Sequence, residues 1–356
     1  MSNYIMSRDI EVASFDNDFN NFKVLNENLC PIFLLRTKNV KAWLSERVID
    51  GSRRSSRALK KIFGLSSFAE DDVTALVMNA ATITDNFWIK KEDSNLTYSD
   101  ICYKENDLFM QALDGASVKD LLEKKPSRTP ELNNMGCQEK GWKLEEDGWW
   151  LYKNQRNEET ISEMITFKIG KLLSFDMAEY ELANEGKYIK TKDFTEGKYN
   201  LQHINCIMHD HDGMTDEDYS YNYTTLKGIN PKLAEEYLNI ICLDAICHNV
   251  DRHTRNYGLI TSREDGRILK LAPNYDNNES LGSYGNISYR GSDKLLDMFV
   301  ELLHEQGISY NLPALKYEDV LNVVEESDVF GIYDSRELSD YIMFRYGFIE
   351  NKLTER

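Results

Sequence analysis

The stretch that decides the fold is His248-Asn-Val-Asp-Arg-His-Thr-Arg-Asn-Tyr-Gly258, followed after a short interval by Ala272-Pro-Asn-Tyr-Asp276. The interval predicts a β-hairpin, because two β-prone segments flank a run with turn chemistry. The strand, turn and strand are expected at residues 257–261, 262–266 and 267–271. Such a hairpin brings its end back beside its beginning, so three polar side chains are expected to converge: Asp251, Asn256 and Asp276.

Two acids and an amide at this spacing suit phosphoryl transfer, in which a protein positions groups and neutralises charge. Asp251 would accept the proton of the attacking hydroxyl, and Asn256 and Asp276 would ligate the Mg²⁺ that bridges the phosphates of ATP. The order Asp-x-x-x-x-Asn, strand, turn, strand, Asp is that of the catalytic and metal loops of protein kinases. Asp-x-x-x-x-Asn alone occurs in many chains, and its competing interpretation is a solvated polar loop. The hairpin and Asp276 favour the site.

The same residues resemble the catalytic and metal loops of HipA-like serine/threonine kinases, the toxin-type kinases of bacteria. The matching positions are Asn249, Asp251, Arg252, His253, Asn256, Tyr257, Gly258, Leu271, Ala272, Pro273, Tyr275 and Asp276. The resemblance runs from about Asn134 onward, and more loosely over the part before it. It implies that Asp251 is the catalytic base and that Asn256 and Asp276 are metal ligands.

The resemblance also implies a biological role and a set of partners. Such kinases inhibit growth by phosphorylating a translation factor or a tRNA-charging enzyme, and a small DNA-binding antitoxin restrains them. The expected partners are therefore a protein substrate and such an antitoxin.

A strand pair upstream predicts a nucleotide-binding lobe. Residues 143–144 and 149–153 flank a hairpin turn at 145–148. Backbone N–H groups near Gly136 can approach phosphates, and Lys153 at the end of the second strand can neutralise them. A lysine that ends an apolar strand often only meets solvent, so the assignment of Lys153 depends on the downstream loops. The phosphate loop lacks a three-glycine pattern.

A helix is expected next, since apolar residues recur at helical spacing from Ile161 to Leu173, with Asn157 as its N-cap. In a kinase, one carboxylate on such a helix orients the strand lysine. Glu159 and Glu163 are the candidates, and both could instead be surface acids; the spacing in similar sequences favours Glu159. The resemblance further implies a hinge in which the backbone around Lys192 and Phe194 bonds adenine.

The helix that carries the catalytic loop is expected from about Pro231 to Cys247, with Asn230 as its N-cap. It is apolar nearly all round, which predicts a buried central helix. Other helices are expected at 40–48, 55–63, 73–81, 293–306, 316–326 and 335–352, and other strands at 84–90, 175–181 and 186–194. Residues 1–30 are polar and aperiodic, and no element is assigned there.

Several polar clusters have competing interpretations. The basic residues from Arg53 to Lys61 favour a solvated helix face over a phosphate or acidic-partner site. The run His209-Asp-His-Asp212 favours a flexible loop over a metal site. His248 and His253 are expected to act as hydrogen-bonding supports. Residues 277–285 suit a mobile activation segment and an ordinary surface loop equally well. Ser127 or Thr129, just before the phosphate loop, is a hypothetical autophosphorylation site.

The composition limits the function classes. A net charge of −18 and a pI near 4.9 argue against direct nucleic-acid binding, which needs clustered Lys and Arg. The six cysteines are scattered without a Cys-x-x-Cys motif, as expected of free thiols in a reducing cytoplasm, and Cys242 and Cys247 are expected to be buried. The sequence contains no apolar run of membrane-spanning length and begins with a polar N-terminus, so a soluble cytoplasmic protein is expected.

These observations together predict an α+β, two-lobed protein-kinase-like fold that uses ATP and Mg²⁺. The expected domains are an N-terminal leader (1–125), a β-rich nucleotide-binding lobe (130–196) and a helical catalytic lobe (197–356), with a linker near 124–130. The expected activity is transfer of the γ-phosphoryl group to a Ser or Thr hydroxyl of a protein. A small-molecule or lipid phosphotransferase on the same fold, or a catalytically silent kinase fold that serves as a binding module, are the alternatives.

Overall fold

The computed structural model describes residues 2–115, 129–208, 218–282 and 293–355. The chain forms two compact units, each built from separate segments. Unit 1 contains Met1–Gln155, Leu182–Gln202 and Leu259–Leu269, and unit 2 contains Arg156–Glu181, His203–Gly258 and Lys270–Arg356. The predicted linker falls largely, and the run 209–212 entirely, outside the described residues, and the predicted domain boundaries stay a prediction.

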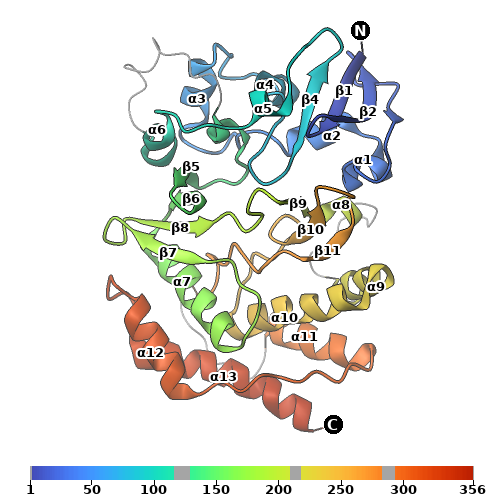
Figure 1. The fold of residues 1–356 in the computed structure, drawn as a ribbon. Helices are drawn as coiled ribbons and strands as arrows, with labels where there is room; N and C mark the ends of the chain where they lie inside the picture. Colours follow the sequence, from blue (N-terminus) through green and yellow to red (C-terminus); the bar gives the residue numbers. More distant parts are fainter. Residues whose placement is uncertain (1, 116–128, 209–217, 283–292, 356) are drawn as a thin grey trace. The chain divides into compact units, whose positions relative to one another are not determined.

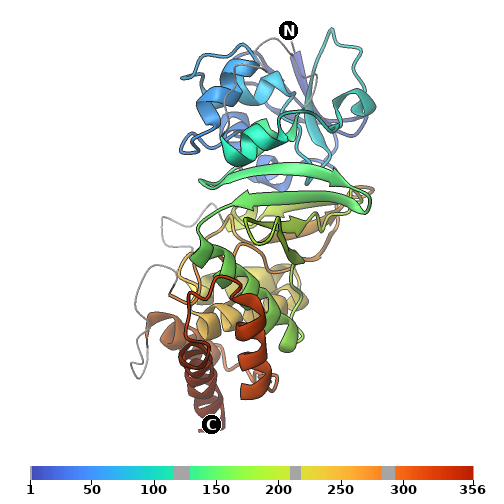
Figure 2. The ribbon, with the colours of Figure 1, turned by 90° about the vertical axis from the view of Figure 1, so that its left-hand side faces the viewer.

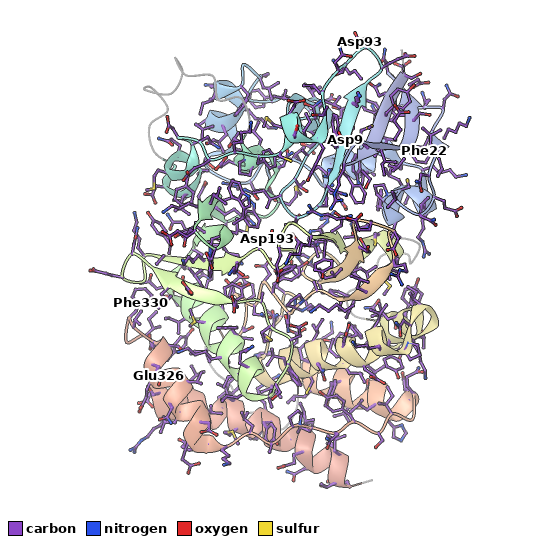
Figure 3. All side chains as sticks on the ribbon, in the orientation of Figure 1. Asp9, Phe22, Asp93, Asp193, Glu326 and Phe330 are labelled. Carbon is purple, nitrogen blue, oxygen red and sulfur yellow. The ribbon has the colours of Figure 1, made fainter. Side chains whose placement is uncertain are left out.

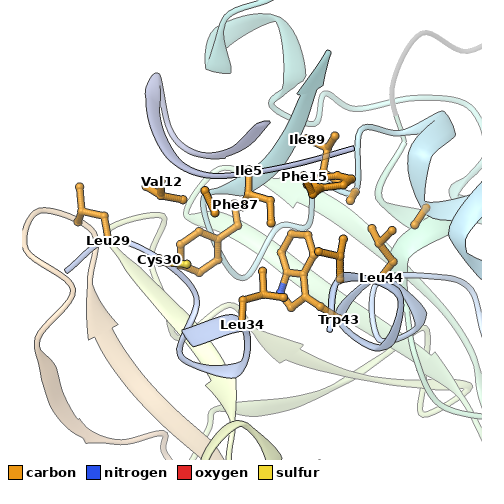
Figure 4. Packing of buried hydrophobic residues seen from close by; sticks show 14 of the residues in the cluster. Ile5, Val12, Phe15, Leu29, Cys30, Leu34, Trp43, Leu44, Phe87 and Ile89 are labelled. Atoms are coloured by element: carbon orange, nitrogen blue, oxygen red, sulfur yellow. The ribbon is translucent and has the colours of Figure 1, made fainter. Parts of the chain in front are cut away.

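The N-terminal stretch without an assigned element supplies three strands of a four-stranded antiparallel sheet in unit 1, and the fourth strand overlaps the one predicted at 84–90 (Figure 1). Its order is β3-β2-β1-β4, with β1 Ser2–Ser7, β2 Ile10–Asp16, β3 Lys23–Val24 and β4 Phe87–Lys91. Helices α1 (Ile32–Thr37) and α2 (Val40–Ser45) pack their apolar side chains against it, with Phe15, Trp43 and Phe87 in the shared core (Figure 4). This burial stabilises an N-terminal segment whose sequence is largely polar.

A buried ion pair fixes the segment before β4. Arg47 donates to both carboxylate oxygens of Asp85, at 2.7 and 2.8 Å, and both side chains are about 6% exposed. The guanidinium also stacks on the ring of Trp43, 4.4 Å from its centroid. Trp88 is fully buried and its indole N–H donates to the carbonyl of Arg8. The segment Thr84-Asp-Asn-Phe-Trp-Ile89 thus contributes to the core of unit 1.

The basic cluster around helix α3 (Ser56–Ile62) is a solvated face only in part: Arg54, Arg57 and Lys61 are exposed, as predicted, but Arg53 and Lys60 are buried. Arg53 is 2% exposed and donates to the backbone carbonyls of Ala112 and Lys140. Lys60 is also buried and donates to the carbonyl of Ala69. The expectation of a solvated face is wrong for these two residues, because neighbouring carbonyls replace water as their acceptors. Unit 1 also contains α4 Asp71–Val77, α5 Tyr98–Ile101, α6 Phe109–Asp114 and η2 Pro130–Asn133.

The strand pair predicted for the nucleotide-binding lobe is present as β5 (Glu139–Glu145) and β6 (Gly148–Asn154), which lie side by side in Figure 2. With β8 (Tyr188–Lys192) and β7 (Tyr180–Ala183) they form a second sheet of order β5-β6-β8-β7. Gly148 has a φ of +126°, which allows the tight turn after Glu145. Lys153 lies directly opposite Lys140 on β5 and Ile189 on β8.

The predicted hairpin after the catalytic loop is confirmed. Strands β10 (Gly258–Ser262) and β11 (Ile268–Leu271) pair with each other and with β9 (Tyr199–His203), in the order β11-β10-β9. The hairpin's tip, from Leu259 to Leu269, belongs to unit 1. There Gly266 has a φ of +71°, and a Cβ on it would lie only 1.6 Å from the carbonyl oxygen of Asn28. This position therefore requires glycine.

Unit 2 is mainly helical (Figure 1). Its helices are α7 Asn157–Leu172, α8 Asn205–Met208, α9 Tyr219–Ile229, α10 Pro231–Cys247, α11 Lys294–Glu305, α12 Tyr317–Ser327 and α13 Ser335–Thr354. The N-cap of α7 is Arg156 rather than Asn157, because the carboxylate of Glu159 bonds both the backbone and the side chain of Arg156. Helix α10 is buried along most of its length, as predicted, and the Asn230 side chain caps it. Within the described ranges, no helix combines the length and the apolar character needed to span a bilayer.

Candidate functional site

The rigid end of α10 carries the catalytic loop. His248 adopts the left-handed conformation (φ 53°) and ends the helix, and its backbone N–H donates to the carbonyl of Asp244. Its ring Nδ1 lies 2.8 Å from the Tyr341 hydroxyl, which confirms the predicted hydrogen-bonding role. Cys242 and Cys247 in the same helix are buried, as predicted, and none of the six cysteines, all of them in the described segments, forms a disulfide.

Asp251 and Asn256 are joined within one loop. The side-chain amide of Asn256 donates to the backbone carbonyl of Asp251 at 2.8 Å and lies 3.4 Å from its Oδ2. The backbone N–H of Asp251 donates to the Asn249 side-chain oxygen at 3.2 Å, which orients the start of the loop. Asp251 itself is half exposed, whereas Asn256 is buried. A half-exposed carboxylate beside a fixed amide can meet an incoming hydroxyl group.

Asp276 follows β11 in a fixed backbone conformation. Its φ is +61°, a left-handed value that Asp tolerates better than most residues. Its backbone N–H donates to the Tyr180 hydroxyl at 3.0 Å. Two residues earlier, Asn274 forms a parallel bridge with Met177. The loop is thus held from both sides at the position where a metal ligand is predicted.

The acids at this site repel one another. Partial burial raises the pKa of Asp251, and the negative charge of Asp276 adds to the effect, while the nearby His253 opposes it. Burial also raises the pKa of Glu279, to about 7, and the charges of Glu159, Asp251 and Asp276 contribute. The two loops do lie close together, as the hairpin predicts, because one guanidinium, that of Arg252, donates to the carbonyls of both Asn256 and Tyr275. A cation among these carboxylates would relieve the repulsion.

Arg252 connects the two loops. Its guanidinium pairs with the buried Asp244 and also donates to the backbone carbonyls of Asn256 and Tyr275. The sequence motif contains Arg252 but indicates no role for it, and Asp244 lies outside the motif. One feature of the sequence does indicate a buried ion pair at Asp244: it is an acid in the otherwise apolar end of α10, and a buried carboxylate needs a partner.

The two candidate acids of α7 are both buried. Glu159 is 3% exposed and pairs with Arg156 at 2.8 Å. Glu163 is fully buried one turn later. The interpretation of either residue as a plain surface acid is therefore wrong.

The other predicted residues, Gly136, Lys153, Lys192 and Phe194, belong to unit 1, whereas Asp251, Asn256 and Asp276 belong to unit 2. Lys153 is 5% exposed at the end of β6. Gly136 has a φ of +101°, and a Cβ there would lie 2.5 Å from the ammonium of Lys140. Lys192 ends β8 and pairs with Asp147 at 2.7 Å. Phe194 is half-buried in the following turn, after Asp193, which is labelled in Figure 3.

The segment after Asp276 was expected to be either a mobile activation segment or a surface loop. Residues 277–282 form neither a mobile segment nor a surface loop, since Asn277, Ser280 and Leu281 are fully buried. The backbone of Leu281 donates to the carbonyl of Cys247, and Ser162 donates to the carbonyl of Ser280. Residues 283–285 lie outside the described residues.

Of the two hypothetical phosphorylation sites, Ser127 lies outside the described residues. Thr129 is fully buried, and its hydroxyl caps η2 by accepting from the backbone of Glu131.

Known proteins are similar to this chain in sequence pattern and in fold. The pattern of the HipA-like C-terminal domain matches residues 112–344. The fold is similar to that of the Shewanella oneidensis MR-1 toxin–antitoxin complex of HipA, HipB and operator DNA, at 12% identity and a TM-score of 0.55, over 99% of this chain and 96% of the other. A Helicobacter pylori proinflammatory kinase, CtkA, matches at 15% identity and a TM-score of 0.47, over 61% and 93%. No curated protein matches. The predicted α+β, kinase-like fold is confirmed.

Proposed function

The chain belongs to the family of the HipA-like C-terminal domain, and on this premise we propose that it is an ATP-dependent serine/threonine protein kinase. The observation that carries the proposal is the cluster of Asp251, Asn256 and Asp276: Asn256 donates to the carbonyl of Asp251, and Arg252 joins Asn256 to Tyr275, the neighbour of Asp276. Phosphoryl transfer needs a proton acceptor and cation ligands held in place, and this cluster supplies both residue types.

Asp251 is proposed as the general base. Its carboxylate is half exposed and therefore open to a substrate hydroxyl. The raised pKa makes it a stronger base than an ordinary aspartate. The hydrogen bond that its backbone N–H donates to the Asn249 side-chain oxygen fixes the backbone of the base before a substrate arrives.

The donor set fits Mg²⁺. Asn256 uses its Nδ2 to bond Asp251, so its Oδ1 is the atom that would face a cation, and Asp276 would supply a carboxylate. Across the described ranges, no three His, Cys, Asp or Glu residues gather closely enough to hold a metal by themselves. Two protein ligands completed by phosphate oxygens and water are what Mg²⁺ commonly uses in nucleotide sites. The ion, when bound, neutralises the charge that develops on the transferred phosphoryl group.

The nucleotide contacts are proposed from unit 1. Lys153 would hold the phosphates, with Glu159 or Glu163 as the carboxylate that orients it. The backbone near Gly136 would approach the phosphates, because glycine has no side chain that would keep them away. The backbone around Lys192 and Phe194 would bond adenine.

A protein substrate and a small DNA-binding partner are proposed as well. The similar HipA chain was solved together with HipB and its operator DNA, which supports a partner of this kind. The net charge of −18 supports contact with DNA through that partner rather than by this chain.

The test is to incubate the purified protein with Mg²⁺, ATP and candidate protein substrates and to map phosphate by mass spectrometry. We expect phosphate on Ser or Thr, and a loss of about 100-fold to 10,000-fold in the Asp251→Asn variant. Asp265→Asn, an exposed acid at the tip of the same hairpin, is the matched control and should transfer normally. Bound nucleotide without phosphate on any protein would instead indicate a small-molecule or lipid kinase, or a silent fold.

A further inference from the structure

The proposed catalytic groups lie on two loops that are separated by a hairpin. Asp251 and Asn256 precede β10, and Asp276 follows β11. The two loops must keep a constant spacing, because a base and a metal ligand displaced by about 1 Å lose much of their effect. The hairpin alone does not fix that spacing, since both loops extend beyond its paired residues.

A single guanidinium bridges the loops. On the side of the catalytic loop, Arg252 donates to the carbonyl of Asn256 at 2.6 Å. On the side of the metal loop it donates to the carbonyl of Tyr275 at 3.0 Å and to the side-chain oxygens of Asn274 and Asn277, at 2.9 and 2.7 Å. These contacts reach the residues directly before and after Asp276.

Asp244 holds this guanidinium in place. It is fully buried near the end of α10 and accepts from Arg252 at 2.8 and 2.9 Å, in the two-point geometry that an arginine and a carboxylate favour. Burial opposes the charge on Arg252, but the Asp244 carboxylate outweighs it and raises the arginine's pKa. Asn249 also donates to Asp244 at 3.0 Å. The bridge is thus anchored in α10, a helix that is buried along most of its length.

The metal loop bonds Arg252 through the neutral side chains of Asn274 and Asn277, so the Arg252–Asp244 pair keeps its charge balance. Asn274 and Asn277 are 3% and 0% exposed, and both present their oxygens to Arg252. Their Nδ2 atoms have no hydrogen-bond partner within the described structure, so the amide oxygen is the atom that these positions use. A carboxylate in either place would set a second negative charge beside a guanidinium that Asp244 already balances.

We propose that Arg252 is a positioning residue that sets the distance between the base loop and the metal loop, and that Asp244 sets its orientation. This inference deepens the proposed function and rests on it for the reaction, but the bridge itself can be measured without any nucleotide. The planar guanidinium is required, because an ammonium at one point cannot donate to both loops and to Asp244 together.

The test uses Arg252→Lys, which keeps the positive charge opposite Asp244 but removes the planar guanidinium and its several N–H donors. Arg345→Lys is the matched control: Arg345 is also buried, pairs with Asp293 and donates to the carbonyl of Ala245 at 2.7 Å, and in the described structure it forms no hydrogen bond with residues 250–258 or 271–279. In the nucleotide-free protein, hydrogen exchange of amides 250–258 and 271–279 should speed up in Arg252→Lys and stay unchanged in Arg345→Lys.

With ATP, Arg252→Lys should lower kcat about 100-fold. It should raise the Mg²⁺ concentration for half-maximal rate about tenfold, since removing an outer-shell support commonly weakens metal binding by that factor or more. KM for the protein substrate should change little, because Arg252 is buried and would not contact it. Arg345→Lys should match the wild type in all three parameters.

Asn277→Ala provides a second route if Arg252→Lys does not fold. It removes one acceptor of the metal loop and leaves the Arg252–Asp244 pair intact, so faster exchange at 271–279 and a higher Mg²⁺ requirement are expected. The inference would be overturned if a folded Arg252→Lys or Asn277→Ala variant showed the same hydrogen exchange and the same Mg²⁺ requirement as the wild type. If the wild type transfers no phosphate but exchange still responds to Arg252→Lys, the proposed function fails and the bridge stands.

Discussion

Glu131 shows, at the scale of one residue, what burial of a carboxyl group does to stability. It lies in η2 and is 1% exposed. Burial raises its pKa to about 7, although hydrogen bonding from Asn106 and the charge of Arg53 oppose this. The unfolded chain would have an ordinary pKa near 4.3. Between these values the unfolded form binds fewer protons, so the contribution of Glu131 to stability falls as pH rises through about 4 to 7.

Glu131→Gln should therefore stabilise the protein relative to wild type as pH rises. The difference in the free energy of unfolding should be small near pH 4 and should grow to about 3 kcal/mol at pH 8. Urea titrations at several pH values measure it. Glu146→Gln, in the exposed turn between β5 and β6, removes the same charge and should give a nearly flat difference. A flat profile for Glu131→Gln would show that the folded-state pKa is ordinary.

Single residues also mark the limit of what the sequence predicts about the site. Asp251, Asn256 and Asp276 follow from local spacing and from one hairpin. The pairing of Asp244 with Arg252, and the acceptor role of Asn277, depend on where loops meet in space, which spacing does not encode. The same holds for Arg53, whose acceptors are carbonyls far along the chain.

At the scale of elements, the hairpin tip and Asn28 are in closer contact than any side chain would allow. Gly266 combines a positive φ with an absence of room for a Cβ. Gly64, after α3, has nearly the same φ of +72° but nothing within 4 Å of a Cβ. The two glycines thus separate backbone strain from steric conflict.

Gly266→Ala should destabilise the protein more than Gly64→Ala. The strain of a positive φ costs Ala about 1–2 kcal/mol at both positions. At Gly266 the displaced backbone should add about 1–3 kcal/mol. Chemical denaturation of both variants measures the difference. Equal losses would mean that the tip moves away from Asn28 at little cost.

Elements differ in how well the sequence predicted them. Helix α10 and the strands β10 and β11 have strong local signals, namely a capped apolar run and two segments around a turn. Of the first sheet only β4 was predicted; β1 has no such signal, because it pairs with β4 far along the chain and its apolar residues do not alternate. The strands of this sheet are stabilised by partners that a local pattern does not contain.

At the scale of the whole molecule, the excess of acidic residues determines how the chain can interact with DNA. The chain has 60 acidic and 42 basic residues. Binding of DNA by counterion release needs a local excess of basic groups, and a net charge of −18 opposes it. The proposed DNA contact through a partner is consistent with this balance.

The purified chain alone should not bind duplex DNA. Fluorescence anisotropy of a labelled duplex should stay flat upon titration with the protein at about 50 to 200 mM salt, a range over which phosphate-binding proteins change affinity strongly. A basic DNA-binding protein run in parallel checks the assay. Binding that weakens steeply with salt would reveal a basic patch that outweighs the net charge.

The division of the chain into two units has a consequence for inheritance. The chain passes between the units five times, at residues 155–156, 181–182, 202–203, 258–259 and 269–270. A gene fragment that stops after codon 155 encodes neither 182–202 nor 259–269, which complete unit 1. Recombination at a single breakpoint therefore cannot exchange one unit and leave the other whole. The two units have to be inherited together, and a shuffled gene that splits them should yield a protein that proteases degrade.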